Sequence, residues 1–203
     1  MDKKKELRYF EIDGAFGGNQ DWFTNVVMNI GGCAAATACD CCIYLTKRMG
    51  AESLYPFDID HLNKEDYKRF SQIMKPYIKP RVSGVKKLAW FISGFQRYLE
   101  DIGAAGQIAM EEFSGEHTVK EAESFVKSQI NKNMPIPVLL LQHKDRARFK
   151  DYIWHWFLIV GYEQAGGDFR IKTATYGEAV VFSLKEMWET GFAEKGGLVK
   201  LTL

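Results

Sequence analysis

The chain has 203 residues and a formal net charge of +1, because 27 lysines and arginines nearly balance 26 aspartates and glutamates. This balance gives no electrostatic basis for binding nucleic acid or an acidic membrane. No apolar segment of the kind found in a secretory signal follows the basic first ten residues, and no apolar run is long enough to span a bilayer. We therefore expect a cytoplasmic protein in which residues 1–203 form one domain.

The first half of the chain is mainly helical in pattern. Residues 1–13 are expected to form an irregular arm or a short edge strand, and the Gly- and Asn-rich residues 14–32 a loop. A helix is predicted from Cys33 to about Arg48, buried on most sides because few charged residues interrupt it. Apolar residues at helical spacing predict three further helices, over 63–78, 84–101 and 119–132.

The period of the pattern then changes from helix to strand. Runs rich in β-branched and aromatic residues predict five strands, at 135–142, 152–163, 168–176, 178–183 and 197–203. A short helix is expected at 184–190. Helices followed by antiparallel strands are typical of an α+β domain with two segregated halves.

All four cysteines lie within ten positions, in "CAAATACDCC" (residues 33–42). A zinc site needs ligand pairs from separate loops, and neither a second pair nor a suitably spaced histidine pair is present. The cluster is equally unsuited to disulfides, because its members are too close in the chain to reach distant loops. Plain packing explains Cys39, Cys41 and Cys42, since free cysteine behaves as a small buried hydrophobe.

Cys33 differs from the other three because it stands where "GG" meets the predicted helix. Backbone N–H groups and the positive end of the helix dipole favour an anion at such a position. These surroundings lower the pKa of a thiol and make it a usable nucleophile. The two glycines also leave one side open to an approaching substrate.

A thiol nucleophile needs a base and donors for a negative intermediate, and the sequence contains candidates for both. Gln20 lies upstream of Cys33 in "GGNQDWF" and carries a side-chain amide. His155 lies in the apolar run "YIWHWFLIVGY", where an imidazole is otherwise unexpected. Strand alternation places Trp154 and Trp156 on the face opposite His155, where we expect them to belong to the core.

Together these residues resemble the papain-like cysteine peptidases, and within them the C39-like peptidases of bacteria. The matching positions are Gln20, Cys33 in "GGCAAA" and His155 in "HWFLIVGY", and the strand "RIKTATYG" looks like the "IKNSWG" of papain relatives. The resemblance covers roughly residues 18–48 and 135–190. It implies a papain-like α+β fold, with a helical half that carries Cys33 and a β half that carries His155.

One position departs from the family pattern. The residue expected to be Asn or Asp, which orients the histidine, is Ala174 in this alignment, and Thr173 and Thr175 flank it. A threonine hydroxyl is able to accept a hydrogen bond from an imidazole N–H, more weakly than a carboxylate does. Asp151 and Asp168 are substitutes if the fold brings either close.

The resemblance implies a cysteine peptidase or amidase that uses no cofactor and acts on a peptide or acyl substrate through a thioester. Cys33 is then the nucleophile, His155 the base that holds it as a thiolate, and Gln20 an oxyanion donor, with Thr173 or Thr175 orienting the imidazole. Two alternatives use the same residues: a thiol acyltransferase acting on a carrier-bound thioester, and a papain-like binding module that has lost catalysis.

Overall fold

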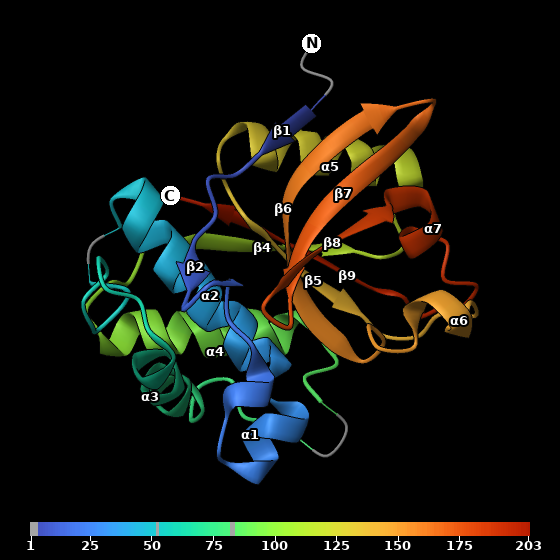
Figure 1. The fold of residues 1–203 in the computed structure, drawn as a ribbon. Coiled ribbons are helices and arrows are strands. Elements are labelled where there is room, and N and C mark those ends of the chain that lie inside the picture. The colour runs from blue at the N-terminus through green and yellow to red at the C-terminus, as the bar shows by residue number, and fades with distance from the viewer. Residues whose placement is uncertain (1–3, 52, 82–83) are drawn as a thin grey trace.

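The computed structural model describes residues 4–51, 53–81 and 84–203 (Figure 1). Four helices gather on one side of the molecule: α1 (Val26–Gly31), α2 (Cys33–Met49), α3 (Lys64–Met74) and α4 (Leu88–Asp101). The antiparallel sheet occupies the other side, so the chain is a mixed α+β structure, as the sequence predicts. No helix within the described residues combines the length and apolar character that a membrane crossing needs.

The main sheet has the strand order β4-β9-β5-β6-β7-β8, and β1 pairs with the far end of β6. A separate two-stranded ribbon joins β2 to β3. The strands are β1 (Lys4–Glu6), β2 (Glu11–Ile12), β3 (Ala15–Phe16), β4 (Ala109–Ser114), β5 (Ile136–Leu140), β6 (His155–Ala165), β7 (Asp168–Thr175), β8 (Glu178–Ser183) and β9 (Gly196–Thr202).

Helix α2 is the centre of the core. Its residues Cys39, Cys41 and Cys42 are completely buried, and the helix packs against β5 and β6 on one side and α3 on another. It ends at Gly50, whose positive φ of 70° is the left-handed conformation that closes a helix and suits glycine. The remaining helices are α5 (Val119–Asn131), α6 (Arg146–Phe149) and α7 (Leu184–Trp188), and α5 lies at the end of the sheet far from α1 (Figure 1).

The expectation of a continuous loop over residues 14–32 is wrong. This segment contains β3, a single 3₁₀ turn (Gln20–Trp22) and α1. Asparagine side chains start both helical pieces, since Asn19 accepts from the Asp21 N–H and Asn25 accepts from the Met28 N–H. These caps stabilise short elements that the apolar pattern does not reveal.

Trp154 and Trp156 do not share one environment. Trp156 is 2% exposed and its indole N–H donates to the Val85 carbonyl (2.6 Å), whereas Trp154 is 45% exposed. Trp154 precedes β6 and has a φ of 52°, so strand alternation does not reach it. Its assignment to the core is therefore wrong.

The strand ends determine where the candidate site lies. His155 is the first residue of β6 and Thr175 the last residue of β7. Because β6 and β7 are antiparallel neighbours, the start of one lies beside the end of the other. The same end of the sheet faces the first turn of α2, which begins with Cys33.

Candidate functional site

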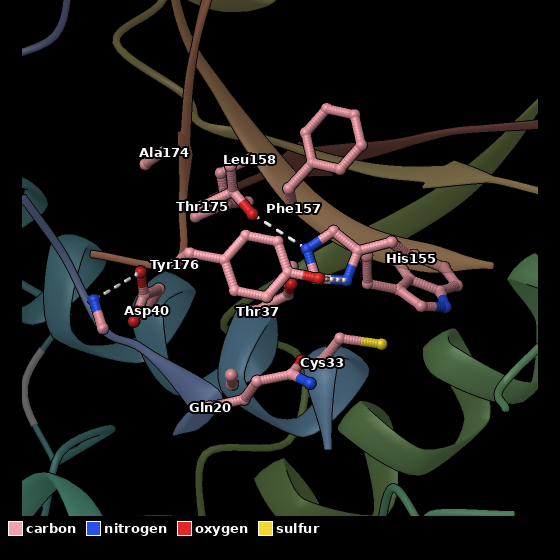
Figure 2. Close-up of a pocket in the computed structure, with 13 residues that line it drawn as sticks. Gln20, Cys33, Thr37, Asp40, His155, Phe157, Leu158, Ala174, Thr175 and Tyr176 are labelled. Atoms are coloured by element: carbon pink, nitrogen blue, oxygen red, sulfur yellow. Dashed lines mark hydrogen bonds between the residues drawn. The ribbon is translucent and has the colours of Figure 1, made fainter. Parts of the chain in front are cut away.

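A cavity of about 20 Å³ lies between the start of α2, the loop before it and the adjacent ends of β6 and β7 (Figure 2). This volume suffices for about one water molecule. Three candidates from the sequence, Cys33, His155 and Gln20, line it together with Thr175. The other lining residues are Gly18, Ala36, Thr37, Asp40, Trp156, Phe157, Leu158, Ala174 and Tyr176.

Cys33 is the first residue of α2 and is 6% exposed. Gly32 caps the helix without a side chain, and a Cβ at this position would overlap the Met28 carbonyl. Burial raises the pKa of the Cys33 thiol, and the backbone N–H groups of Trp156, Ala34 and Cys33 itself act in the opposite direction. Backbone donors from β6 and from the helix start thus favour the thiolate, although burial has the larger effect.

The other three cysteines have none of this character. Cys39, Cys41 and Cys42 are free thiols with 0% exposure, and burial raises the pKa of each well above its ordinary value. Only Cys33 among the four lines the cavity. The four cysteines therefore divide into one at a cavity and three in the core.

The His155 imidazole is 5% exposed, and both of its nitrogens have a neighbour. Nε2 lies 2.8 Å from the Thr175 hydroxyl, and Nδ1 lies 3.4 Å from the Tyr176 hydroxyl. The Tyr176 ring stacks on the imidazole, with centroids 4.5 Å apart and planes at 3° (Figure 2). Burial lowers the pKa of His155 to about 3, so the ring is neutral at physiological pH.

The hydrogen bonds around His155 fit either tautomer of the neutral imidazole, because the Thr175 hydroxyl is able to accept from Nε2–H or donate to Nε2. The Tyr176 hydroxyl donates to the Asp151 carbonyl (3.1 Å), so its proton is not directed at Nδ1. With the imidazole proton on Nε2 and donated to Thr175, Nδ1 is left as an unprotonated acceptor at the cavity. That tautomer has the free ring nitrogen that a general base needs, and the lowered pKa makes this imidazole a weak base.

Only one of the two candidate threonines reaches the imidazole. The Thr173 hydroxyl donates instead to the Val180 carbonyl (3.0 Å), and Thr173 does not line the cavity. Asp168 accepts from the Ser183 hydroxyl (2.7 Å) at the other end of β7, and Asp151 contributes only its backbone carbonyl to Tyr176. The structure therefore leaves Thr175 as the hydrogen-bond partner of the imidazole.

Gln20 lies in the 3₁₀ turn, with its side chain lining the cavity near Cys33 (Figure 2). One amide N–H donates to the Asn29 carbonyl of α1 (3.0 Å). Its Oε1 is buried and has no hydrogen-bond partner among the described residues. The amide has a second N–H, which is available to an acceptor in the cavity.

Asp40 also lines the cavity, although no motif in the sequence indicates it. It lies on α2, seven positions after Cys33, and is 6% exposed. Its carboxylate accepts hydrogen bonds from Tyr9 (2.8 Å), Tyr67 (2.8 Å) and the Gly18 N–H (3.1 Å). Burial raises the pKa of Asp40 to about 6, opposed by these three donors. A lone aspartate inside "AAATACDCC" was the available signal, since an unpaired charge in an apolar helix is costly.

The site thus holds a neutral thiol and a neutral imidazole in a small cavity. The preformed thiolate–imidazolium pair expected from the resemblance is disfavoured here, because burial shifts both pKa values toward the neutral forms. Within the described part of the chain, no three His, Cys, Asp or Glu side chains come together as metal ligands would.

Comparisons with protein-family models, with curated proteins and with solved structures each gave no match. The chemistry of this site therefore has to be inferred from its own residues.

Proposed function

We propose that this chain is a thiol hydrolase with a papain-like fold, similar to the C39-like cysteine peptidases, that cleaves a peptide or amide bond through a thioester on Cys33. The observation that carries the proposal is the meeting of Cys33, His155, Gln20 and Thr175 at one cavity, from three separate parts of the chain. A nucleophile, a base with an orienting partner and an oxyanion donor are the groups that acyl transfer needs.

The first half-reaction forms the thioester. The Cys33 sulfur attacks the substrate carbonyl carbon, and the thiol proton passes to Nδ1 of His155 in the same step. The carbonyl electron pair moves to oxygen, where the Gln20 amide and the Cys33 backbone N–H stabilise the negative charge. Collapse of this intermediate breaks the carbon–nitrogen bond, and His155 returns the proton to the leaving amine.

The second half-reaction releases the acid. Water attacks the thioester carbonyl and gives a proton to His155, and collapse of the intermediate breaks the carbon–sulfur bond. The proton then returns to the Cys33 sulfur. A proton transfer concerted with attack suits a pair that is neutral at rest. Since the cavity is only about 20 Å³ and Cys33 is 6% exposed, a substrate carbonyl must displace groups that cover Cys33.

Acetylation by p-nitrophenyl acetate tests the proposal without a known substrate. We expect an acetyl thioester on Cys33, located by peptide mass spectrometry and followed by slow release of acetate. His155→Ala should lower the acetylation rate by roughly 10²–10⁴-fold, the range for loss of a general base. The completely buried Cys39, Cys41 and Cys42 provide internal controls in the same spectra.

A catalytically inactive binding module is the second candidate, because Cys33 and His155 are both about 95% buried. If Cys33 is acetylated no faster than the three core cysteines, or if its rate is unchanged in His155→Ala, this second candidate replaces the enzyme. Thr175→Val offers an intermediate test, since it keeps the side-chain shape and removes only the hydroxyl that meets Nε2.

A further inference from the structure

The buried carboxylate of Asp40 has no cationic partner among the described residues, and three hydrogen-bond donors surround it. The titratable groups that face it are Tyr9, Tyr67 of α3, and Cys39 and Cys41 of its own helix. Burying an unpaired carboxylate is unfavourable, and an apolar residue of similar size would avoid the cost. The arrangement therefore suggests that this carboxylate does something that an apolar side chain would not.

The loop formed by residues 16–20 (the site loop) lies directly on Asp40. The Gly18 N–H donates to Oδ2 of Asp40 at 3.1 Å. A Cβ at Gly17 would come within 2.8 Å of the same oxygen, and a Cβ at Gly18 would overlap the Tyr67 hydroxyl. Both glycines are therefore needed for the backbone to lie this close to the carboxylate and its tyrosine partner.

The other side of the site loop is bound to the turn that follows Thr175. The Phe16 N–H donates to the Gly177 carbonyl (2.7 Å), and the Gly177 N–H donates to the Gly18 carbonyl (3.0 Å). Asn19 adds a hydrogen bond from its side-chain amide to the Tyr176 carbonyl (2.9 Å). The loop is thus held between Asp40 on the helix of Cys33 and the turn whose Tyr176 ring covers His155.

From this network we propose that Asp40 is a positioning residue for acyl transfer: it anchors the site loop to α2, so that the Gln20 amide faces the oxyanion formed at Cys33. The inference rests on the proposed thioester chemistry for its effect on rate. Gln20 follows the anchored Gly18 by two residues and lines the same cavity as Asp40 and Cys33. The carboxylate touches no reacting atom and acts through the loop.

Two reactions of the same thiol separate positioning from general loss of structure. Acetylation by p-nitrophenyl acetate passes through an oxyanion, whereas alkylation by iodoacetamide displaces iodide at carbon and forms none. In Asp40→Ala we expect acetylation of Cys33 to fall at least tenfold relative to alkylation, in the direction of Gln20→Ala, since loss of one oxyanion donor costs roughly 10²–10³-fold. An equal fall in both rates, or no fall in either, would overturn the proposal.

Asp40→Asn is the conservative variant. Its amide oxygen still accepts from Gly18, and Tyr67 is able to redirect its hydroxyl to the Ala36 carbonyl, which lies 3.2 Å away. We expect its acetylation-to-alkylation ratio to stay within about threefold of the unmodified protein. Cys42→Ala is the matched control, because it removes a buried atom from α2 at a position that does not line the cavity.

Hydrogen exchange tests the anchoring itself, whatever the reactivity of Cys33. In Asp40→Ala the amides of Gly18 and Gly177 should exchange at least tenfold faster, while the amides of α2 keep their protection. If exchange accelerates but Cys33 of the unmodified protein is never acetylated, the anchor stands and the proposed enzyme fails. If exchange at both glycines is unchanged, the anchor itself is wrong.

Discussion

Asp40 and His155 line one cavity and are both almost completely buried, but the protein surrounds them differently. Asp40 receives three hydrogen bonds of 2.8–3.1 Å from donors on three separate segments. His155 has one close partner, Thr175 at 2.8 Å, and a longer contact of 3.4 Å with Tyr176. No carboxylate among the described residues meets its ring.

These different surroundings explain why burial leaves Asp40 ionised and His155 uncharged at neutral pH. Three donors partly offset the desolvation of Asp40, whose pKa rises to about 6 and not higher. Nothing comparable offsets the desolvation of His155, whose pKa falls to about 3. At neutral pH the carboxylate is ionised and available to hold a loop, and the imidazole is uncharged and available to accept a proton.

The largest expected effect is on the pH dependence of stability, where the two residues act in opposite directions. His155 binds its proton more weakly when folded, so its contribution is present above pH 6.5 and is lost, by roughly 5 kcal/mol, as pH falls toward 3. Asp40 binds its proton more tightly when folded, so its contribution is present below pH 3.8 and is lost, by roughly 3 kcal/mol, as pH rises to 6.

Urea unfolding of Asp40→Asn, His155→Gln and the double variant between pH 3.5 and 7.5 separates these contributions. Asp40→Asn keeps His155, so its free energy of unfolding relative to the double variant should rise with pH. His155→Gln keeps Asp40, so its free energy of unfolding relative to the double variant should fall as pH rises. All other titrating groups are common to the three proteins and cancel. Parallel curves would show that neither side chain keeps its shifted pKa in solution.

The next largest effect is on stability, at the point where Gly18 lies close to Tyr67 and Asp40. Gly18→Ala should lower the free energy of unfolding by about 3 kcal/mol, because the added methyl overlaps Tyr67 and crowds Asp40. Gly50→Ala is the matched control: its φ is 70° and nothing lies within 4 Å of the added Cβ, so only backbone strain of about 1 kcal/mol is expected. Equal losses in chemical denaturation would mean that the site loop yields easily.

The sequence predicts the long elements well because their patterns are strong. The helix beginning at Cys33 and the strands from 135 onward appear near their expected bounds. Helix α1 is missed because it is only six residues long, and Val26, Val27 and Ile30 are exposed, so it has no amphipathic pattern to detect.

The sequence predicts which residue types form the site, but it does not predict how β6 and β7 pair and therefore which threonine meets His155. Cys33, Gln20 and His155 carry recognisable chemistry, and the structure brings all three to one cavity. Which residue of β7 meets His155 depends on strand pairing, and the pairing of β6 with β7 shifts between Ile159 and Gly161. A one-residue shift exchanges the two faces of a strand, so the choice of Thr175 is not visible in the sequence.

A smaller effect is expected from the hydroxyl that orients the base. Thr175→Val should lower Cys33 acetylation roughly tenfold, because Nε2 loses the hydrogen-bond partner that orients the imidazole. Thr173→Val is the matched control on the same strand, since its hydroxyl bonds Val180 and it does not line the cavity. A similar decrease in both variants would point to general loosening of β7.

Thr175→Asp tests the role of position 175 by replacing the hydroxyl with a stronger hydrogen-bond acceptor. A carboxylate beside Nε2 favours the imidazolium, so the pKa of His155 should rise, and the surroundings of His155 would then resemble those that an ion pair needs. In a plot of the Cys33 acetylation rate against pH, the fall in rate on the acid side should move to higher pH by at least one unit. If that fall does not move, another group limits the reaction in acid.

The smallest effect is expected from Tyr176→Phe, which keeps the ring stacked on His155 and removes only the hydroxyl. That hydroxyl donates to the Asp151 carbonyl and lies 3.4 Å from Nδ1, too long for a strong hydrogen bond. Acetylation should therefore change less than threefold. Tyr176→Ala also removes the ring, admits water to the imidazole and should raise the pKa of His155 toward its ordinary value, which NMR titration measures directly. If Phe and Ala at position 176 give the same His155 pKa, the low value comes from the surrounding core and not from the ring that covers the imidazole.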